Sequence, residues 1–245
     1  MITGATGKLG KVFVNYFLNK GDKVVAVSRS KNKLDLMQSE NLVLKKNLFL
    51  IEIDLMSNNF EELILEKLRE KDISPCCLVN NARSMSNLLI NDFGSVDEKK
   101  MLDEYKLGVI VPYKLTIALL RNEKSLLKKV VNVGSIYGEV APNRNLKDLN
   151  PDPIHYGLTK AALSNLTKQL AVRFADKNIN INCISYGGVE GSVDESFVKK
   201  YSRLCPSGRM LNQFDLAGPL DMLLSNDASG INGHILMVDG GWTIW

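Results

Sequence analysis

MITGATGKLG, residues 1–10, is the stretch that decides the expected fold, and apolar residues at helical spacing follow it at Val12, Phe13, Tyr16 and Phe17. This pattern predicts the end of a β-strand, a glycine-rich turn and a helix whose N-terminal amides face an anion. Glycines at positions 4, 7 and 10 allow a tight turn and close approach of the backbone, as a dinucleotide-binding loop requires. Three glycines alone are weak evidence, so a plain glycine-rich turn remains an alternative.

Strand and helix patterns alternate along the rest of the chain. Apolar segments typical of strands lie at 23–27, 48–54, 76–82, 129–135, 179–184 and 234–238. Helical patterns lie between them, the longest at about 97–121 and 152–176. The alternation predicts an α/β, Rossmann-like, doubly wound sheet of seven parallel strands with helices on both faces, in a single domain over 1–245. Few residues precede Thr3, so either a central strand is truncated or the true start of the chain lies upstream.

Composition excludes several classes of protein. The chain has 245 residues, 45% of them hydrophobic and 24% charged, and its net charge of +4 comes from scattered lysines and arginines. No basic run is interleaved with aromatic residues, so nucleic-acid binding is not expected. The four cysteines, at 76, 77, 183 and 205, make neither a zinc-ligand set nor a disulfide framework. With no long apolar segment and no signal-peptide pattern, we expect a soluble, cytoplasmic protein without a metal or a membrane partner.

The end of the second strand indicates which dinucleotide binds. Ser28 and Arg29 lie about 20 residues beyond the glycine loop, where an acidic residue would favour NAD. Arg29 instead supplies a cation for a 2′-phosphate, with Lys8, Lys31 and Lys33 nearby, so NADP(H) is favoured over NAD(H). The alternative is that Arg29 is a solvated surface residue. Asp54, at the end of the third strand, is placed to meet the adenine.

The stretch His155-Tyr156-Gly157-Leu158-Thr159-Lys160 carries the chemistry. Tyr156 and Lys160 share one helix face, and a nearby ammonium favours the phenolate form that acid/base catalysis needs. An ordinary amphipathic helix is the alternative for this pair. Ser135 adds a hydroxyl at the carboxyl end of the fifth strand, the edge where open α/β sheets bind ligands. A hydroxyl that caps a turn is the alternative for Ser135.

In order and spacing, these residues resemble the short-chain dehydrogenase/reductase family, in its single-domain branch, over essentially the whole chain. Thr3-Gly4 with Gly7 and Gly10 looks like the family's cofactor loop, and Asn80-Asn81-Ala82 looks like its Asn-Asn-Ala-Gly strand end. Ser135, Tyr156 and Lys160 look like its catalytic residues. Further matches are Asp54 as the adenine contact, Asn182 and Gly187 in the Asn-x-x-x-Pro-Gly segment, and Val238-Asp239-Gly240-Gly241 in the last strand and turn.

The resemblance implies hydride transfer between a nicotinamide and a carbonyl or alcohol. Tyr156 would pass the proton, Ser135 would hold the substrate oxygen, and Lys160 would assist Tyr156 and contact the nicotinamide ribose. The implied cofactor-binding residues are Thr3, Gly4, Gly7, Lys8, Leu9, Gly10, Ser28, Arg29, Asp54, Leu55, Asn81, Ala82, Lys160, Gly187 and Val189. By the same analogy, we expect a homodimer or homotetramer with helix 152–176 as the contact.

The chain departs from the family pattern at several positions. Arg83 replaces the last glycine of Asn-Asn-Ala-Gly, and Tyr186 replaces the proline before Gly187. Tyr105 stands where many members have an asparagine that completes a proton relay, so the water wire through that position is in doubt. The gap from Ser135 to Tyr156 exceeds the usual one, so an insertion is expected within 139–153. The glycine spacing is closer to that of the family's extended branch.

For the substrate, three functions remain open. Ser-Ile-Tyr-Gly at 135–138, the insertion and the ending at 238–242 look most like reductases of bacterial flagellin and surface-glycan loci, which predicts a sugar or sugar phosphate. A 3-oxoacyl-carrier-protein reductase is the nearest rival, and a protein that binds NADP(H) without turnover is another. A polar segment at 189–212 is expected to act as a lid over the substrate. Candidate contacts for anionic groups of the substrate are Arg83, Arg144, Arg203 and Arg209.

Overall fold

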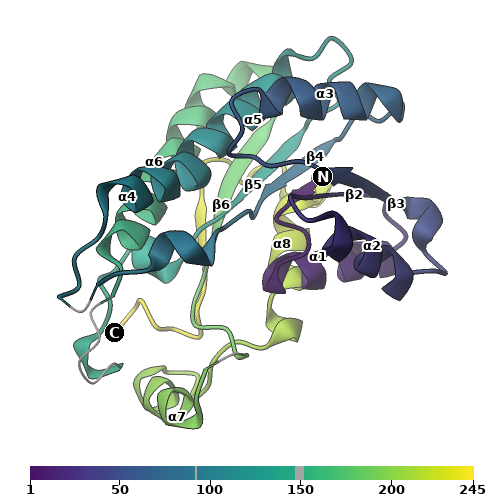
Figure 1. The fold of residues 1–245 in the computed structure, drawn as a ribbon. Coiled ribbons are helices and arrows are strands. Elements are labelled where there is room, and N and C mark those ends of the chain that lie inside the picture. Colours follow the sequence, from purple (N-terminus) through teal and green to yellow (C-terminus); the bar gives the residue numbers. More distant parts are fainter. Residues whose placement is uncertain (92, 147–151, 192) are drawn as a thin grey trace.

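The computed structural model describes residues 1–91, 93–146, 152–191 and 193–245. It contains a seven-stranded sheet in the order β3-β2-β1-β4-β5-β6-β7, with every neighbouring pair parallel (Figure 1). The strands are β1 (Ile2–Thr3), β2 (Val24–Ser28), β3 (Leu48–Glu52), β4 (Cys77–Asn80), β5 (Lys129–Val133), β6 (Asn180–Tyr186) and β7 (Ile235–Val238). The predicted doubly wound sheet is confirmed, with strand ends shifted by one or two residues. β1 is a central strand of two residues.

Helices cover both faces of this sheet. The helices are α1 (Lys8–Asn19), α2 (Lys31–Glu40), α3 (Phe60–Glu70), α4 (Glu98–Tyr105), α5 (Val111–Arg121), α6 (Ile154–Arg173), α7 (Glu195–Leu204) and α8 (Ala217–Leu224). Helices α3, α5 and α6 lie on one face, and α1, α2 and α8 lie on the other (Figure 1). Each face has its own apolar cluster, because successive side chains of a strand point to opposite sides. In β4, for example, Leu78 packs with α3 and α5, whereas Val79 packs with α1.

The predicted long helix at 97–121 is one continuous rod with a wider turn in its middle. Helices α4 and α5 are joined by a π-helical segment, Lys106–Ile110. Within it, Gly108 faces α6 so closely that a Cβ there would lie 2.3 Å from Cγ2 of Thr159. The π-helical segment and α6 therefore pack so closely that a side chain at position 108 would not fit between them. This close contact holds α6 in place.

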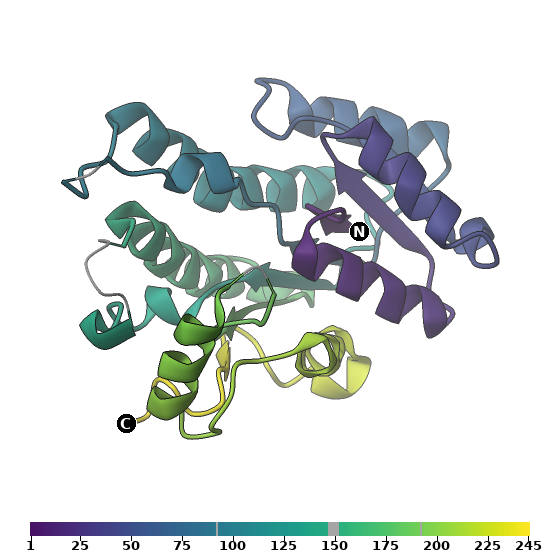
Figure 2. The ribbon, with the colours of Figure 1, turned by 60° about the horizontal axis from the view of Figure 1, so that its bottom comes forward.

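The segment predicted as a polar lid is more structured than expected. Helix α7 lies within 189–212, and its Tyr201 stacks on Trp242 at 4.4 Å between ring centroids. Figure 2 shows α7 in green beside the yellow C-terminal segment. A third apolar cluster forms here, from Ile136, Leu146, Tyr201, Cys205, Met210 and Trp242. Position 192 of this segment lies outside the described residues, as do 147–151 of the predicted insertion.

The sequence analysis predicted no membrane-spanning segment, and the described helices can be compared with that prediction. None of them combines the length and the apolar character needed to cross a bilayer.

Candidate active site

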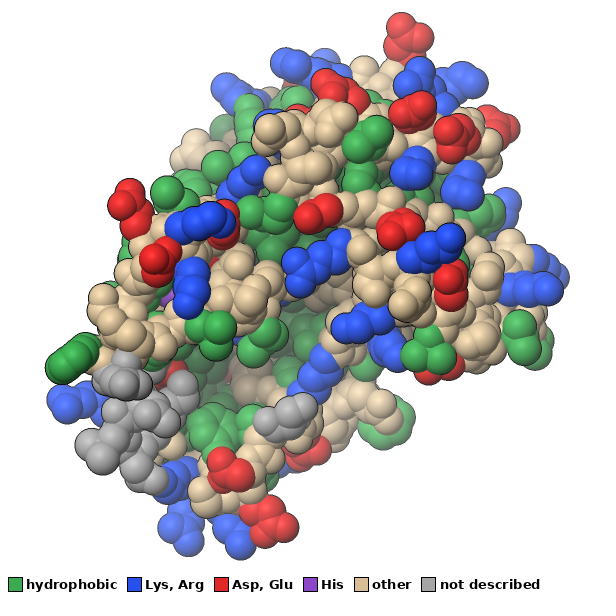
Figure 3. Space-filling model, viewed as in Figure 1, with side chains coloured by type: hydrophobic (Ala, Val, Ile, Leu, Met, Phe, Trp, Pro, Cys, Tyr) green, Lys and Arg blue, Asp and Glu red, His purple; other side chains and the backbone are tan. Residues whose placement is uncertain are grey.

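A cavity of about 1320 Å³ lies at the carboxyl edge of the sheet. The ends of β1, β2, β4, β5 and β6 all reach it, as parallel strands require. Figure 3 shows the surface hollowed on this side, with lysine and arginine side chains on the rim. We call the part near Gly4, Gly7, Ser28, Arg29 and Asp54 the glycine-loop half. The part near Arg83, Ser135, Tyr137, Tyr156 and Lys160 is the Tyr156 half.

Backbone shape forms the wall of the glycine-loop half. Gly4 has φ of +61°, and a Cβ there would lie 2.7 Å from Cα of Ala82. A Cβ on Gly10 would lie 2.3 Å from the carbonyl oxygen of Gly4. The first glycine thus permits the turn and the third lets α1 start against it, so the loop places the N-terminus of α1 at the cavity. The plain-turn alternative does not require this close packing.

Thr3 and Asn81 tie the loop to the end of β4. The Thr3 hydroxyl accepts hydrogen bonds from the backbone N–H of Asn81 (3.0 Å) and of Ala82 (3.1 Å). The Asn81 amide donates in return to the carbonyl oxygens of Thr3 (3.0 Å) and Gly4 (3.2 Å). Two neighbouring strand ends are therefore held in register by side chains that the sequence analysis assigned to the cofactor.

The predicted cofactor residues converge on the cavity, with two exceptions. Thr3 is 1% exposed and does not line it, and neither does Gly10. Both act behind the wall, through the hydrogen bonds and the close packing just described. The residues that do line it are Gly4, Gly7, Lys8, Leu9, Ser28, Arg29, Asp54, Leu55, Asn81, Ala82, Lys160, Gly187 and Val189.

The far end of the glycine-loop half carries cations. Arg29 and Lys33 line the cavity, whereas Lys31 does not. The buried hydroxyl of Ser28 is hydrogen-bonded to that of Thr6 at 2.8 Å. Asp54 is exposed, and its carboxylate accepts from the backbone N–H of Met56 at 3.0 Å. A glycine turn, a helix N-terminus and cations in one elongated cavity fit a dinucleotide such as NAD or NADP.

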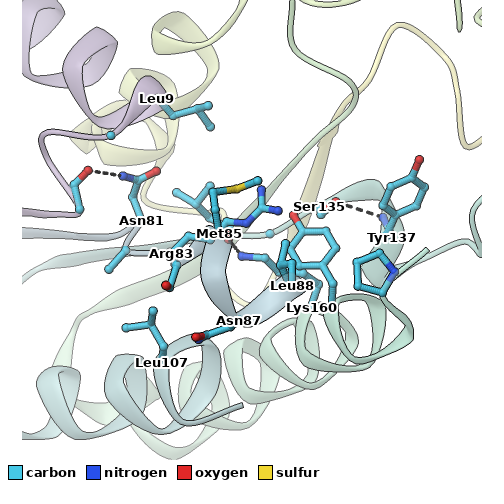
Figure 4. A pocket seen from close by; sticks show the side chains of 18 of the residues that line it. Leu9, Asn81, Arg83, Met85, Asn87, Leu88, Leu107, Ser135, Tyr137 and Lys160 are labelled. Carbon is cyan, nitrogen blue, oxygen red and sulfur yellow. Dashed lines mark hydrogen bonds between the residues drawn. The ribbon is translucent and has the colours of Figure 1, made fainter. Parts of the chain in front are cut away.

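Ser135, Tyr156 and Lys160 line the Tyr156 half together, as the sequence analysis predicted (Figure 4). The Lys160 ammonium is buried and donates to the carbonyl oxygen of Val133 at 2.6 Å, which fixes it to the end of β5. Its Nζ lies 5.8 Å from the centroid of the Tyr156 ring. The Ser135 oxygen accepts from the backbone N–H of Tyr137 at 3.3 Å, so it does cap a turn. This bond leaves the proton of the Ser135 hydroxyl available to a ligand.

Two side chains that were not predicted to contact Tyr156 enclose it. The Arg83 guanidinium lies over its ring, with Cζ 4.5 Å from the centroid. Tyr137 meets the ring edge-on, with centroids 6.5 Å apart and planes at 80°. Burial raises the pKa of the Tyr137 phenol above its ordinary value, and burial also raises the pKa of Tyr201, another lining residue, to about 12. Both of those phenols stay protonated near neutral pH.

The four arginines proposed for anionic groups do not come together. Arg83 lines the cavity, but Arg144, Arg203 and Arg209 are exposed outside its lining. Arg209 instead forms a two-point ion pair with Asp215, with N–O distances of 2.6 and 2.9 Å. The prediction was wrong for these three because residues far apart in the sequence reach one site only if the fold brings them there.

The departures at 186 and 105 have structural explanations. Tyr186 is 4% exposed, packs against Phe13 and donates its hydroxyl proton to the carbonyl oxygen of Leu216 at 2.6 Å. It therefore extends β6 as a core residue where the family has a proline. Tyr105 is 44% exposed and lies outside the cavity lining. Its side chain does not take the place of the asparagine in a relay.

Sequence reasoning missed one segment that lines the Tyr156 half, the short turn after Arg83, which includes Met85, Asn87 and Leu88 (Figure 4). Its Asn87 carbonyl is hydrogen-bonded to Nε2 of buried His155 at 2.7 Å. Helix α7, which lies within the predicted lid, also lines this half through Phe197 and Tyr201, two residues that the sequence analysis did not single out. Their spacing on one helix face points equally to core packing.

Comparisons with known proteins agree with this geometry. A family model described as enoyl-(acyl carrier protein) reductase matches residues 4–243. The chain belongs to the short-chain dehydrogenase/reductase family. It is accordingly a nicotinamide-dependent oxidoreductase that acts on alcohol or carbonyl groups.

Several relatives of this short-chain dehydrogenase/reductase align over nearly its whole length. Post-translational flagellin modification protein A of Campylobacter coli is 26% identical over 253 residues, which cover 98% of this chain and 96% of that protein. The 3-oxoacyl-[acyl-carrier-protein] reductase FabG of Buchnera aphidicola is 28% identical over 253 residues, with 98% and 95% covered. A short-chain dehydrogenase from Leptospira borgpetersenii with bound NAD+ superposes with a TM-score of 0.85 at 25% identity, covering 99% of this chain and 91% of that one.

Proposed function

We propose that this enzyme reduces, or oxidises in reverse, a carbonyl carbon of a sugar or sugar phosphate used in surface-glycan biosynthesis. The observation that carries the proposal is the convergence of Ser135, Tyr156 and Lys160, from β5 and α6, on one wall of a cavity whose other end is a glycine loop. The flagellin modification relative and the Arg83 cation beside Tyr156 support the choice of substrate.

The residues of the Tyr156 half would divide the work. Ser135, whose oxygen accepts from the N–H of Tyr137, would donate a hydrogen bond to the substrate oxygen and so orient the substrate. Tyr156 would give or take the proton at that oxygen, because Lys160 and Arg83 both place positive charge beside its ring. Lys160 is fixed by Val133 and keeps further N–H donors for the cofactor ribose. A bound nicotinamide would supply or accept the hydride.

We propose NADP(H) as the preferred cofactor. Arg29 and Lys33 line the far end of the cavity, where a 2′-phosphate would need cations. In the same region, the side chain of Ser28 brings no negative charge. An acidic residue there would repel the phosphate and favour NAD(H).

A 3-oxoacyl-carrier-protein reductase is the second candidate. The FabG relatives and the description of the matching family model favour it. The two candidate functions use the same catalytic residues, so only the substrates that the enzyme turns over can distinguish them. Turnover of acetoacetyl thioesters with a kcat/KM well above that of any sugar or sugar phosphate would favour the acyl substrate.

The decisive experiment is a dehydrogenase screen of sugars, sugar phosphates and acyl thioesters with both cofactors, on the wild type and on Tyr156→Phe. We expect the variant to lose about 10²- to 10⁴-fold in kcat because it lacks the proton that is transferred. Its affinity for NADPH, measured by fluorescence, should be nearly unchanged. Tyr113→Phe is the matched control, since Tyr113 lies on α5 outside the cavity lining. Cofactor binding without turnover of any substrate by the wild type would instead support a protein that only binds NADP(H).

The chain is also proposed to form a homodimer or homotetramer through α6. The helix carries exposed apolar side chains at Leu158 (58%) and Val172 (79%). Light scattering of the wild type and of Val172→Glu should show a multiple of 27.2 kDa that the substitution reduces. A monomeric wild type would contradict this proposal.

The segment 189–212 is proposed to act as a substrate lid. Val189, Phe197, Tyr201 and Met210 line the cavity from it, and Lys8 of α1 donates to the Val189 carbonyl oxygen at 2.9 Å. Amide hydrogen exchange should slow across this segment when cofactor and substrate bind.

A further inference from the structure

Arg83 occupies a position that the resemblance assigns to glycine, and its side chain reaches the centre of the Tyr156 half. Its guanidinium Cζ lies 4.5 Å from the centroid of the Tyr156 ring, within the usual range of a cation–π contact. Figure 4 shows Arg83 and Lys160 both directed into the cavity, with Ser135 nearby. A residue that replaces glycine at a strand end has thus put a permanent charge next to the reacting phenol.

The guanidinium of Arg83 lies over the face of the Tyr156 ring, with Cζ 4.5 Å from the centroid. A guanidinium has five N–H donors, and a cation–π contact leaves donors available for a second partner. Among the residues that the structure describes, no carboxylate or carbonyl oxygen accepts a hydrogen bond from Arg83. The side chain is therefore positioned by the cation–π contact, with donors available to a ligand.

The acidic residues that line the cavity all have other partners, and Asp54, in the glycine-loop half, accepts from the backbone N–H of Met56. Glu139 accepts from the Ser164 hydroxyl at 2.8 Å, and Asp103 pairs with Lys99 at 2.9 Å. Asp152 also has a partner of its own. In the Tyr156 half, Arg83 and buried Lys160 thus both supply positive charge, and no carboxylate of the described residues pairs with the Arg83 guanidinium.

The cofactor does not account for this charge. Its phosphates would have the α1 N-terminus and, at the other half of the cavity, Arg29 and Lys33. Lys160 donates to Val133 and is the cation suited to the ribose. Arg83 remains as the cation suited to the substrate.

We propose that Arg83 binds an oxyanion of the substrate, a carboxylate or a phosphate, a few bonds away from the carbon that exchanges hydride. This inference rests on the proposed function. The cation–π contact with Tyr156 preorganises the guanidinium, so an anionic substrate is held by it while the substrate's carbonyl oxygen lies between Ser135 and Tyr156. A neutral analogue would lose this contact and would leave Arg83 without a partner.

The test uses matched pairs of small carbonyl compounds that differ in charge. Acetoacetate and ethyl acetoacetate test for a carboxylate, and dihydroxyacetone phosphate and dihydroxyacetone test for a phosphate. We expect the wild type to prefer the anionic member of at least one pair by about 10- to 100-fold in kcat/KM with NADPH. Arg83→Met should remove that preference, mainly through KM for the anion, and Arg83→Lys should restore part of it. The preference of the wild type between the pairs identifies the oxyanion.

A binding measurement separates this inference from the proposed function. Malonate and inorganic phosphate are titrated calorimetrically into Tyr156→Phe with NADP+ present, and into the double variant that also carries Arg83→Met. Tyr156→Phe should bind one of the anions at least tenfold more tightly than the double variant does. If no carbonyl compound is turned over but this difference is seen, the proposed substrate class fails and the anion site stands.

Two results would overturn the inference. One is a wild type with no preference for charge in either pair and no Arg83-dependent binding of either anion. The other is a preference that survives Arg83→Met. Thermal unfolding and NADPH affinity of the variants are measured alongside, so that a misfolded variant is recognised. Arg83→Lys keeps the positive charge, so it separates an effect of lost charge from an effect of altered structure.

Discussion

The glycine-loop half and the Tyr156 half of the cavity differ in what forms their walls. In the first, Gly4 and Gly10 let backbone atoms approach closer than any side chain would permit, Gly4 against Ala82 just past the end of β4 and Gly10 against Gly4 itself. In the second, Arg83, Ser135 and Tyr156 come from three distant segments and meet through their side chains. A wall made by backbone tolerates almost no change, whereas a wall made by side chains can be altered to suit a new substrate.

The largest expected effect comes from adding one methyl group to the glycine-loop half. A Cβ at Gly10 would lie 2.3 Å from the Gly4 oxygen and 2.7 Å from the Ala5 oxygen, and both are backbone atoms. We expect Gly10→Ala to weaken NADPH binding at least tenfold and to lower the free energy of unfolding by about 1–3 kcal/mol. For a chain of this length, that corresponds to a fall in Tm of roughly 3–10 °C.

Gly218→Ala in α8 is the matched control for that prediction. A Cβ there meets no atom within 4 Å, so the substitution should leave Tm unchanged or raise it slightly. Equal Tm and equal NADPH affinity for the two variants would show that the close packing around Gly10 does not shape the loop.

A narrower effect, on NADPH use but not on stability, is expected from the charge at the far end of the same half. Arg29→Ala should lower kcat/KM for NADPH by about 10- to 100-fold and leave the value for NADH nearly unchanged, because only NADPH carries the 2′-phosphate. Lys31→Ala is the control, since Lys31 is close in sequence but does not line the cavity. If the wild type prefers NADH, the assignment of Arg29 is wrong.

The smallest effect on activity is expected outside both halves, at the opposite edge of the sheet. Cys76 precedes β4, and the hydrogen bond from Cys77 lowers the pKa of its thiol to about 6, although burial acts in the other direction. The reactive thiolate therefore forms as the pH rises through about 6 and is lost below it. Burial raises the pKa of Cys183 to about 11, so that thiol should not react in the folded protein.

Iodoacetamide labelling followed by mass spectrometry checks this prediction. The rate at Cys76 should reach half its maximum near pH 6, and Cys76→Ser should abolish fast labelling. Turnover should be unaffected by the label because Cys76 lies outside the cavity. A midpoint near the ordinary thiol value, or a loss of turnover on labelling, would contradict it.

The interpretation of several side chains depended on information that spacing does not contain. Asn182 matched a family motif. In the structure, its side-chain amide donates to the Ile231 carbonyl oxygen at 2.8 Å, and its side-chain oxygen accepts from the backbone N–H of His234 at 2.9 Å. It therefore joins β6 to the segment before β7. Asp239 likewise holds the last turn, by accepting from Gly241 and Thr243. A motif identified these residues, but only their partners showed that they support the fold.

By itself the sequence determined the doubly wound sheet, the glycine loop and the shared helix face of Tyr156 and Lys160. All three depend on local spacing, because strand and helix periods and glycine conformations are set by neighbouring residues. Tertiary structure alone decided that Arg83 covers Tyr156 while Arg144, Arg203 and Arg209 stay outside, and that Tyr186 joins the core. Such contacts depend on where segments that are far apart in the sequence lie after folding. No periodicity of the chain encodes how close two such segments come to each other.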